Sequence, residues 1–208
     1  MYKEFDIEHW VHREAYDMFT RKPFPHYLLA VNIDVTRLLE YKRREGLSFY
    51  LSIIYLMTKA LNEQENFRLR VVDGRVVLYD RVEPNFTHKR IDEEMYHIYT
   101  ARLEGSLPEF VRQTSEAIAG QTAFYAGDEP APNLIYYSCA PTIECTCITN
   151  PGMSDPDDAI PRINWGRYTE REGRMLLNVS ITVNHRFVDG FHVGRFVNRV
   201  KELIDELP

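Results

Sequence analysis

The stretch Asn184-His185-Arg186-Phe187-Val188-Asp189-Gly190-Phe191-His192 joins two segments of different periodicity. Residues 174–183 before it have the character of a strand. After it, apolar side chains at positions 193, 196, 197, 200, 203, 204 and 207 have the spacing of an amphipathic helix. His185 therefore stands where a strand ends and a turn begins, a place where the sheet fixes the backbone and the side chain can reach a cleft. The short pattern H-x3-D-G by itself fits a structural histidine as well as a catalytic one.

The remainder of the chain predicts helices and strands that do not alternate regularly. Helices are expected over about 8–21, 36–45, 48–64 and 106–120, and the helix at 48–64 is apolar on most sides, so we expect it to be buried. Asp73-Gly74 predicts a hairpin between strands at 68–72 and 75–79. Further strands are expected at 27–33, 85–88, 95–100, 134–140, 143–149, 160–168 and 175–184. The mixture indicates an α+β fold in a single domain spanning residues 1–208.

Composition argues against several classes of protein. The net charge is −6 and no basic run exceeds three residues, which argues against nucleic-acid binding. The acidic N-terminus is unlike a signal peptide, and the longest apolar stretch, 49–57, is far too short to span a bilayer, so we expect a cytoplasmic protein. Cys139, Cys145 and Cys147 are odd in number and lack zinc-ligand spacing. They predict buried thiols, the last two on one face of a strand, and no metal site.

Three residues carry the candidate chemistry. His185 can accept a proton near neutral pH, which suits a general base acting on a hydroxyl group. Asp189 has three possible roles: to accept from the histidine, to cap the last helix or to pair with a cation elsewhere. We favour the last two roles, because a base that approaches a substrate needs room. Ser138 lies in an otherwise apolar strand, where a hydrogen bond to the backbone is the simpler interpretation and a donor to a developing oxyanion is the sharper one.

Several segments together resemble the chloramphenicol acetyltransferase family of the trimeric, CoA-dependent type. Residues 10–16 resemble its W-x-R-x-E-x-F opening, and Ser48-Phe49-Tyr50 its F-Y-P helix, with Leu51 where proline is usual. Residues 80–87 are similar to its D-S-V-x-P-x-F-T strand. Residues 184–196 are similar to its H-H-A-V-C-D-G-F-H-V-A/G-R-F signature. The resemblance covers essentially the whole chain.

The resemblance implies a two-layer sandwich of a mixed β-sheet and helices, assembled as a homotrimer with active sites at subunit interfaces. It implies acetyl-CoA as co-substrate, chloramphenicol or a similar small hydroxyl compound as acceptor, and hence antibiotic resistance. His185 would be the general base, Ser138 the oxyanion donor and Asp189 a structural residue in a salt bridge. Arg167 and Tyr168 fall where the family contacts the CoA adenosine. The implied acceptor pocket comprises Met18, Phe19, Tyr27, Tyr96, Tyr136 and Asn164, the last at the position of the family's pocket threonine.

The chain also departs from the family pattern. Asn184 replaces the first histidine of the family's pair, and His12 stands where the family has the arginine that pairs with the motif aspartate. Arg13 or Arg186 would have to substitute, or His12 itself would pair with Asp189. The run His185-Arg186-x-x-Asp189-Gly190 also resembles dihydrolipoamide acyltransferase catalytic domains. Alternatives are therefore the same chemistry on a different acceptor, such as a lipoyl-type thiol, or a non-catalytic relative.

Overall fold

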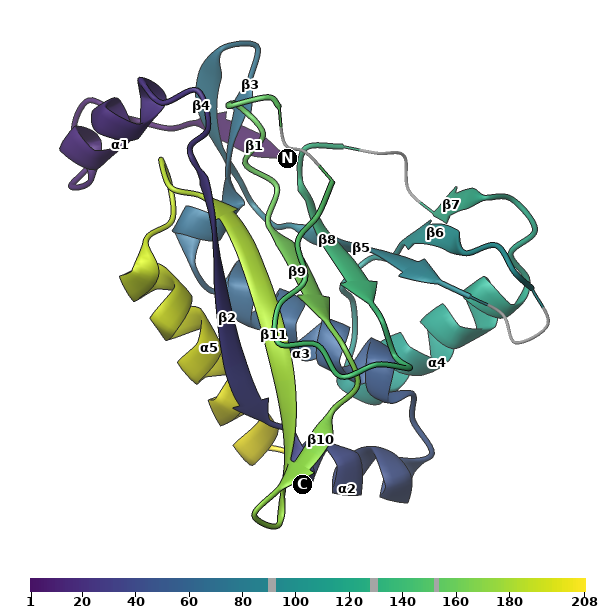
Figure 1. Ribbon diagram of the computed structural model, residues 1–208. Coiled ribbons are helices and arrows are strands. Elements are labelled where there is room, and N and C mark those ends of the chain that lie inside the picture. The colour runs from purple at the N-terminus through teal and green to yellow at the C-terminus, as the bar shows by residue number, and fades with distance from the viewer. Residues whose placement is uncertain (90–92, 128–130, 152–153) are drawn as a thin grey trace.

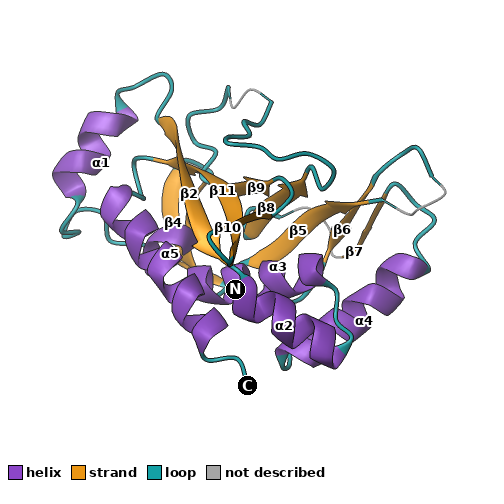
Figure 2. Cartoon of the chain, turned by 60° about the horizontal axis from the view of Figure 1, so that its bottom comes forward, coloured by secondary structure: helices purple, strands orange, loops and turns teal. Residues whose placement is uncertain are grey.

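A mixed β-sheet covered on one face by helices makes up most of the molecule (Figures 1 and 2). The computed structural model describes residues 1–89, 93–127, 131–151 and 154–208. The helices are α1 Arg13–Thr20, α2 Thr36–Glu45, α3 Phe49–Asn62, the 3-10 turn η1 Glu65–Arg68, α4 Leu107–Ala119 and α5 Gly190–Asp205. The strands are β1 Tyr2–Glu4, β2 His26–Asp34, β3 Leu69–Val72, β4 Arg75–Tyr79, β5 Glu83–His88, β6 His97–Thr100, β7 Tyr125–Gly127, β8 Leu134–Cys139, β9 Arg162–Trp165, β10 Thr169–Arg171 and β11 Arg174–Asn184.

The large sheet has the strand order β10-β11-β9-β8-β5-β6-β7. In addition, the whole length of β2 pairs with β11. The pairs β5–β8, β8–β9 and β6–β7 are parallel, and the other pairs are antiparallel. A small antiparallel sheet of β1, β4 and β3 lies apart from it. The expected mixed sheet is thus confirmed.

The two faces of the large sheet differ in what they contact. On β11, Leu177, Val179, Ile181 and Val183 belong to the buried core beneath the helices. α3, with most of its side chains buried, packs at the centre of that layer, between α4 and α5 (Figure 2). Because strand side chains alternate, Ser180 and Thr182 point to the opposite face, which we call the outer face.

Local sequence signals account for the ends of several elements. Asp73 and Gly74 both have positive φ, 50° and 74°, as a type I′ hairpin turn requires. Gly46 ends α2 in the left-handed conformation. At the start of α4, the Glu109 carboxylate accepts from the Ser106 amide at 2.7 Å and from the Ser106 hydroxyl at 2.6 Å.

One predicted strand is wrong. Residues 143–149 form a loop that crosses the outer face, where the Ile148 amide donates to Ser180 Oγ at 2.9 Å. β9, which lies beneath this loop, already pairs with β8 and β11 on its two edges, so it has no free edge for another strand. The short strands β1, β7 and β10 were not predicted. Residues 128–130, before β8, and residues 152–153, before β9, lie outside the described residues.

Candidate functional site

The turn after β11 holds His185 between two aromatic rings. The His185 amide extends the pairing with the β2 side by donating to the Pro25 carbonyl at 2.8 Å. Its imidazole stacks on Phe19 of α1, with ring centroids 4.0 Å apart and planes 11° apart. The Tyr27 ring of β2 lies 4.4 Å away on a tilted plane. Nδ1 of His185 is buried and has no hydrogen-bond partner among the described residues. The ring is therefore held by packing.

Asp189 caps α5. Its side chain accepts from the His192 backbone amide at 3.0 Å. Nδ1 of His192 lies 2.8 Å from Asp189 Oδ1 and 3.2 Å from the Asp189 backbone nitrogen, and these two contacts require opposite protonation of Nδ1. We place the proton on Nδ1, because a carboxylate oxygen and a bare nitrogen lone pair would repel each other at 2.8 Å. Burial raises the pKa of Asp189, but the amides of His192 and Phe191 and the nearby His192 and His12 rings outweigh it, so the pKa lies below its usual value.

His192 thus contacts Asp189 where the family pattern led us to expect an arginine, and none of the three substitutes we considered does so. Arg13 pairs with Glu8 at 2.5 Å and Asp17 at 2.7 Å. Arg186 pairs with Asp157 at 2.8 Å.

His12 lies one step further from Asp189, with its ring edge-on to the His192 ring at 4.9 Å. Burial lowers the pKa of His192, and His12 and Arg195 lower it further, against the opposing effect of Asp189. The contact between His192 and Asp189 at neutral pH is therefore mainly a hydrogen bond rather than an ion pair.

Ser138 lines a cavity of about 340 Å³ on the outer face of the sheet. Its hydroxyl lies 3.4 Å from the Thr87 hydroxyl of the parallel strand β5. At the next strand, the buried Asn164 donates to Asn150 Oδ1 at 2.7 Å, and Asn150 donates back at 3.4 Å. The remaining lining residues are Asn85, Ile98, Tyr125, Leu134, Tyr136 and Tyr137. The described lining contains hydroxyl and amide groups but no acidic or basic side chain.

His185 and Ser138 do not meet within one chain. The register aligns Ser138 with Asn164 and Asn164 with Ser180, two strand steps in all. His185 lies five residues beyond Ser180, so two steps of about 4.8 Å and five rises of about 3.3 Å give a separation of roughly 19 Å. Ser138 also faces the outer side, whereas Tyr27, which contacts His185, packs against the core. The candidate residues thus form two separate groups in one chain, one around His185 and one around Ser138, and we call these groups half-sites.

The predicted pocket residues divide between these half-sites. Phe19 and Tyr27 flank His185, and Met18 beside Phe19 is 45% exposed. The Tyr27 hydroxyl is buried without a partner among the described residues, and burial, reinforced by Asp189, raises its pKa to about 12. Tyr136 and Asn164 line the Ser138 cavity. Tyr96 lines neither half-site; it is 47% exposed, and its ring contacts Phe124.

Sequence reasoning missed several residues of the cavity. Asn85 and Thr87 alternate with the buried Phe86 in β5, so strand periodicity would have placed them on one face. Asn150 lies in a loop, and no local pattern links it to Asn164. His192, in the third position of α5, was also missed: its backbone amide and its ring both contact the Asp189 side chain.

The remaining candidate residues lie outside both half-sites. Arg167 is exposed, and Tyr168 packs edge-on against Phe49 at 5.1 Å. The three thiols are free. Cys139 and Cys145 are only partly buried and Cys147 is exposed, so the prediction of buried thiols is wrong. Burial, helped by Cys145, raises the pKa of Cys139 to about 12, so this thiol stays protonated. The described ranges contain no cluster of three His, Cys, Asp or Glu side chains suited to a metal ion, and no helix among them could cross a membrane.

Comparison with known proteins gives a consistent result. A profile of the chloramphenicol acetyltransferase family matches residues 1–201. The chloramphenicol acetyltransferase of Escherichia coli is 26% identical over 205 residues, covering 97% of this chain and 96% of the relative. That of Streptomyces acrimycini is 28% identical over 203 residues, covering 96% and 92%. A solved chloramphenicol acetyltransferase superposes with a TM-score of 0.89 at 26% identity, covering 98% of this chain and 100% of that chain. A dihydrolipoamide acetyltransferase of Azotobacter vinelandii superposes with a TM-score of 0.68 at 16% identity, covering 94% and 87%, which is a likeness of fold alone.

Proposed function

The chain belongs to the chloramphenicol acetyltransferase family, and we propose that it transfers an acetyl group from acetyl-CoA to a hydroxyl of chloramphenicol or a similar small molecule. The observation that carries this proposal is the presence of both chemical groups that the reaction needs. His185 stands in a packed turn, and Ser138 stands in a cavity with neutral polar walls. Thioester acyl transfer needs a base and an oxyanion donor.

In the proposed mechanism, Nε2 of His185 takes the proton of the acceptor hydroxyl as the oxygen attacks the thioester carbonyl. The buried Nδ1 would carry the other ring proton, which leaves Nε2 with a free lone pair. The Ser138 hydroxyl donates a hydrogen bond to the tetrahedral oxyanion. Collapse of this intermediate breaks the carbon–sulfur bond, and the imidazolium returns its proton to the departing thiolate. The products are the acetyl ester and CoA, and His185 is neutral again.

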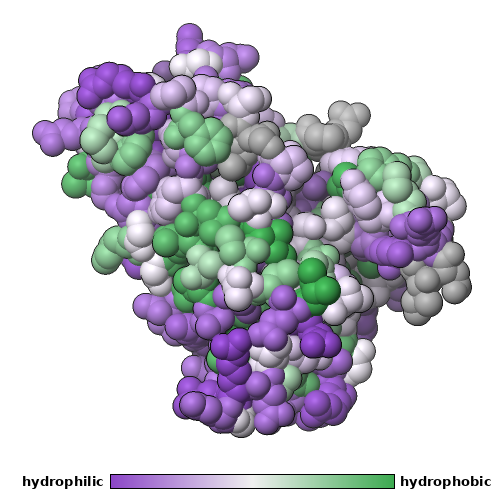
Figure 3. Space-filling model, viewed as in Figure 1, coloured by the Kyte–Doolittle hydropathy of each residue, from purple (hydrophilic) through white to green (hydrophobic). Residues whose placement is uncertain are grey.

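The separation of the half-sites supports a homotrimer in which His185 of one subunit serves the Ser138 cavity of the next. A base about 19 Å from the oxyanion donor is out of hydrogen-bond reach of the same acceptor hydroxyl. A second copy of the chain would supply the missing half. The outer face also presents an apolar patch over β2 and β11 (Figure 3). On β2, Leu28 and Ala30 pair with Thr182 and Ser180, whose side chains point to this face. Such a patch suits burial against another subunit.

Arg167 and Tyr168 are the proposed contacts for the CoA adenosine. The exposed Arg167 guanidinium can pair with a phosphate, and the half-buried Tyr168 ring offers an edge or face for stacking. Asp189 and His12 are proposed to act structurally, through His192. We likewise propose that the protein works in the cytoplasm and that its acceptor pocket combines residues of both half-sites.

A direct assay tests the proposed function. The purified protein is incubated with acetyl-CoA, a thiol reagent that detects released CoA, and a panel containing chloramphenicol and dihydrolipoamide. Release of CoA with chloramphenicol supports the proposal, and release with dihydrolipoamide alone would favour the lipoyl-type alternative. Absence of release with every acceptor would indicate a non-catalytic relative. Release that persists unchanged in His185→Ala would contradict the mechanism.

A further inference from the structure

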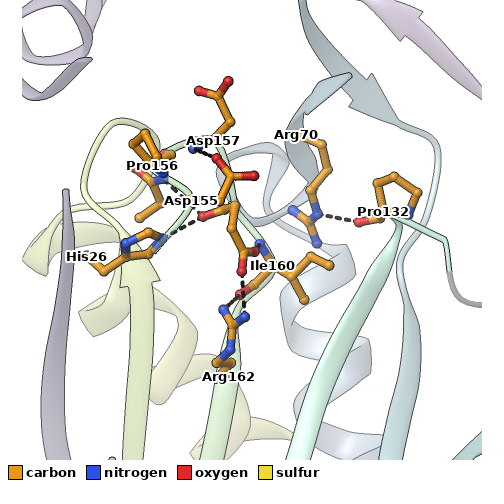
Figure 4. A network of polar contacts seen from close by, with 10 residues as sticks. His26, Arg70, Pro132, Asp155, Pro156, Asp157, Ile160 and Arg162 are labelled. Carbon is orange, nitrogen blue, oxygen red and sulfur yellow. Dashed lines mark hydrogen bonds and ion pairs between the residues drawn. The ribbon is translucent and has the colours of Figure 1, made fainter. Parts of the chain in front are cut away.

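The turn that carries His185 is tied to a loop far away in the sequence, residues 155–158. Figure 4 shows this loop between His26 of β2 and Arg162 of β9. His26 Nε2 lies 2.6 Å from the Asp158 carbonyl, and Arg162 donates to the Asp158 carboxylate at 2.5 Å. The loop is therefore anchored to the ends of both strands beside the turn.

Asn184, directly before His185, uses its whole side chain in this connection. Its Nδ2 donates to the Pro156 carbonyl at 2.9 Å and to the Asp158 carbonyl at 3.1 Å. Its Oδ1 accepts from the Arg186 amide at 3.1 Å and from Arg186 Nε at 3.4 Å. The bond to the amide two residues on is an Asx turn, which fixes the backbone around His185. Asn184 is only 2% exposed, and both donors and both acceptor sites of its side-chain amide are used.

Arg186, directly after His185, completes the connection. It donates to Asp157 Oδ1 at 2.8 Å and to the Pro156 carbonyl. Its side chain is 3% exposed, whereas that of Asp157 is 51% exposed. A buried guanidinium that loses its partners is strongly unfavourable, so the charge holds the turn and the loop together. The Asn184 carbonyl in turn accepts from the amides of Phe187 and Val188, each at 3.1 Å.

We propose that Asn184 and Arg186 are positioning residues for His185, and that they act by clamping the turn to residues 156–158. The two side chains bracket the histidine on either side in the sequence and bond to the loop. The His185 imidazole instead lies between Phe19 and Tyr27. Packing alone leaves the ring free to shift with its backbone, and the clamp removes that freedom. This role rests on the proposed function, in which His185 is the base.

The test uses four variants: Asn184→Ala, Asp157→Asn, His185→Ala and the control Asn198→Ala. Asn198 is an exposed asparagine on α5, so its variant controls for the loss of an amide. Asp157→Asn removes the negative charge from an exposed position, and the guanidinium of Arg186 keeps the amide oxygen and the Pro156 carbonyl as acceptors. Steady-state kinetics with acetyl-CoA give kcat and KM, and a ¹H–¹³C spectrum of the labelled imidazoles, with His185 assigned by its loss in His185→Ala, reports the ring directly.

We expect Asn184→Ala to lower kcat about 10- to 100-fold, because a displacement of about 1 Å at a reacting group costs about 10²-fold. Both KM values should stay within about threefold, and the His185 resonance should shift or broaden. Asp157→Asn should change kcat and the resonance in the same direction to a smaller degree, and Asn198→Ala should change neither.

Two results would overturn the proposal. One is a folded Asn184→Ala protein with wild-type kcat and an unchanged His185 resonance. If Asn184→Ala does not fold, the other is an Asp157→Asn protein with wild-type values of both. If the wild-type protein does not transfer acetyl groups, the proposed function fails, and the His185 resonance still decides whether the clamp positions the ring.

Discussion

Mixing two inactive variants, His185→Ala and Ser138→Ala, is expected to restore acetyl transfer. In one chain the two residues are about 19 Å apart by strand spacing and rise, and they face different sides of the sheet. Under the proposed mechanism, a working site then needs the histidine of one subunit and the serine of another. In a mixed trimer, the Ser138→Ala chain supplies an intact histidine and the His185→Ala chain supplies an intact serine. An interface that joins these two groups regains a complete site.

The size of the recovery follows from chance assembly. Loss of a general base costs about 10²- to 10⁴-fold, and loss of an oxyanion donor costs about 10²- to 10³-fold, so each parent should have at most about 1% activity. In a ring with equivalent interfaces, random mixing at equal amounts gives an intact histidine at about half of the sites and an intact serine at about half. The mixture should therefore regain about a quarter of the wild-type activity.

A second mixture controls for the assembly itself. Wild-type protein mixed equally with the double variant should retain about a quarter of the sites if each site spans two subunits, and about half if each site lies in one chain. The subunits are denatured and refolded together, exchange is verified with two affinity tags, and CoA release is measured. If subunit exchange is verified and the activity of either mixture still equals the mean of its two component proteins, the two-subunit site is refuted.

Three further predictions follow from single contacts. Ser138→Ala should lower kcat about 10²-fold or more with little change in KM, as measured by steady-state kinetics, whereas unchanged kcat would exclude the oxyanion role. Gly166→Ala should destabilise the protein by about 1–3 kcal/mol in denaturant unfolding, because its Cβ would lie 2.6 Å from the Ile143 carbonyl oxygen, while Gly194→Ala, with open space around it, should not. His192→Gln should reduce the loss of stability between pH 7.5 and 5.5. Because burial lowers the folded-state pKa of His192, the unfolded chain takes up the proton first as the pH falls below about 6.5, so stability is lost on acidification. Equal pH dependence of the two proteins in denaturant titrations would contradict this reasoning.

The sequence predicts best those features that depend on neighbouring residues. The Asp73-Gly74 hairpin, the start of the helix expected from residue 106 and the helix after Asp189 are all confirmed. Each depends on a turn or a helix end that a few adjacent side chains can specify by themselves. The buried helix α3 is equally well predicted, because a segment that is apolar on most sides has to be surrounded by protein.

The error at 143–149 has a different origin. The local pattern fits a strand, but pairing requires a free sheet edge, and β8, β9 and β11 leave none at that place. The loop instead crosses close to the backbone at Gly166, where the Arg167 amide donates to the Ile143 carbonyl at 2.7 Å. Such an approach depends on the completed sheet, so periodicity within seven residues does not reveal it.

The candidate site could be predicted from the sequence only in part. The position of His185 at a strand end follows from periodicity. The apolar strand around Ser138 left two roles open for its hydroxyl, and the resemblance to the family favoured the oxyanion donor. That the two groups belong to separate half-sites follows only from the strand register, which joins residues 138, 164 and 180 across three strands.

The contacts of Asp189 determine how the turn between β11 and α5 is held in place. A pair between a carboxylate and an arginine would keep its charge at any pH that the folded protein tolerates. Here Asp189 instead contacts His192, whose pKa is lowered by burial, and His12 lies behind that ring. The contact with a neutral imidazole is screened little by salt, because only one partner is charged. The turn thus relies on hydrogen bonds from two directions: the cap at Asp189 on its far side and the clamp at Asn184 on its near side. His185 lies between these two fixed points, which is the arrangement that the proposed base needs, because its own ring is held by packing alone.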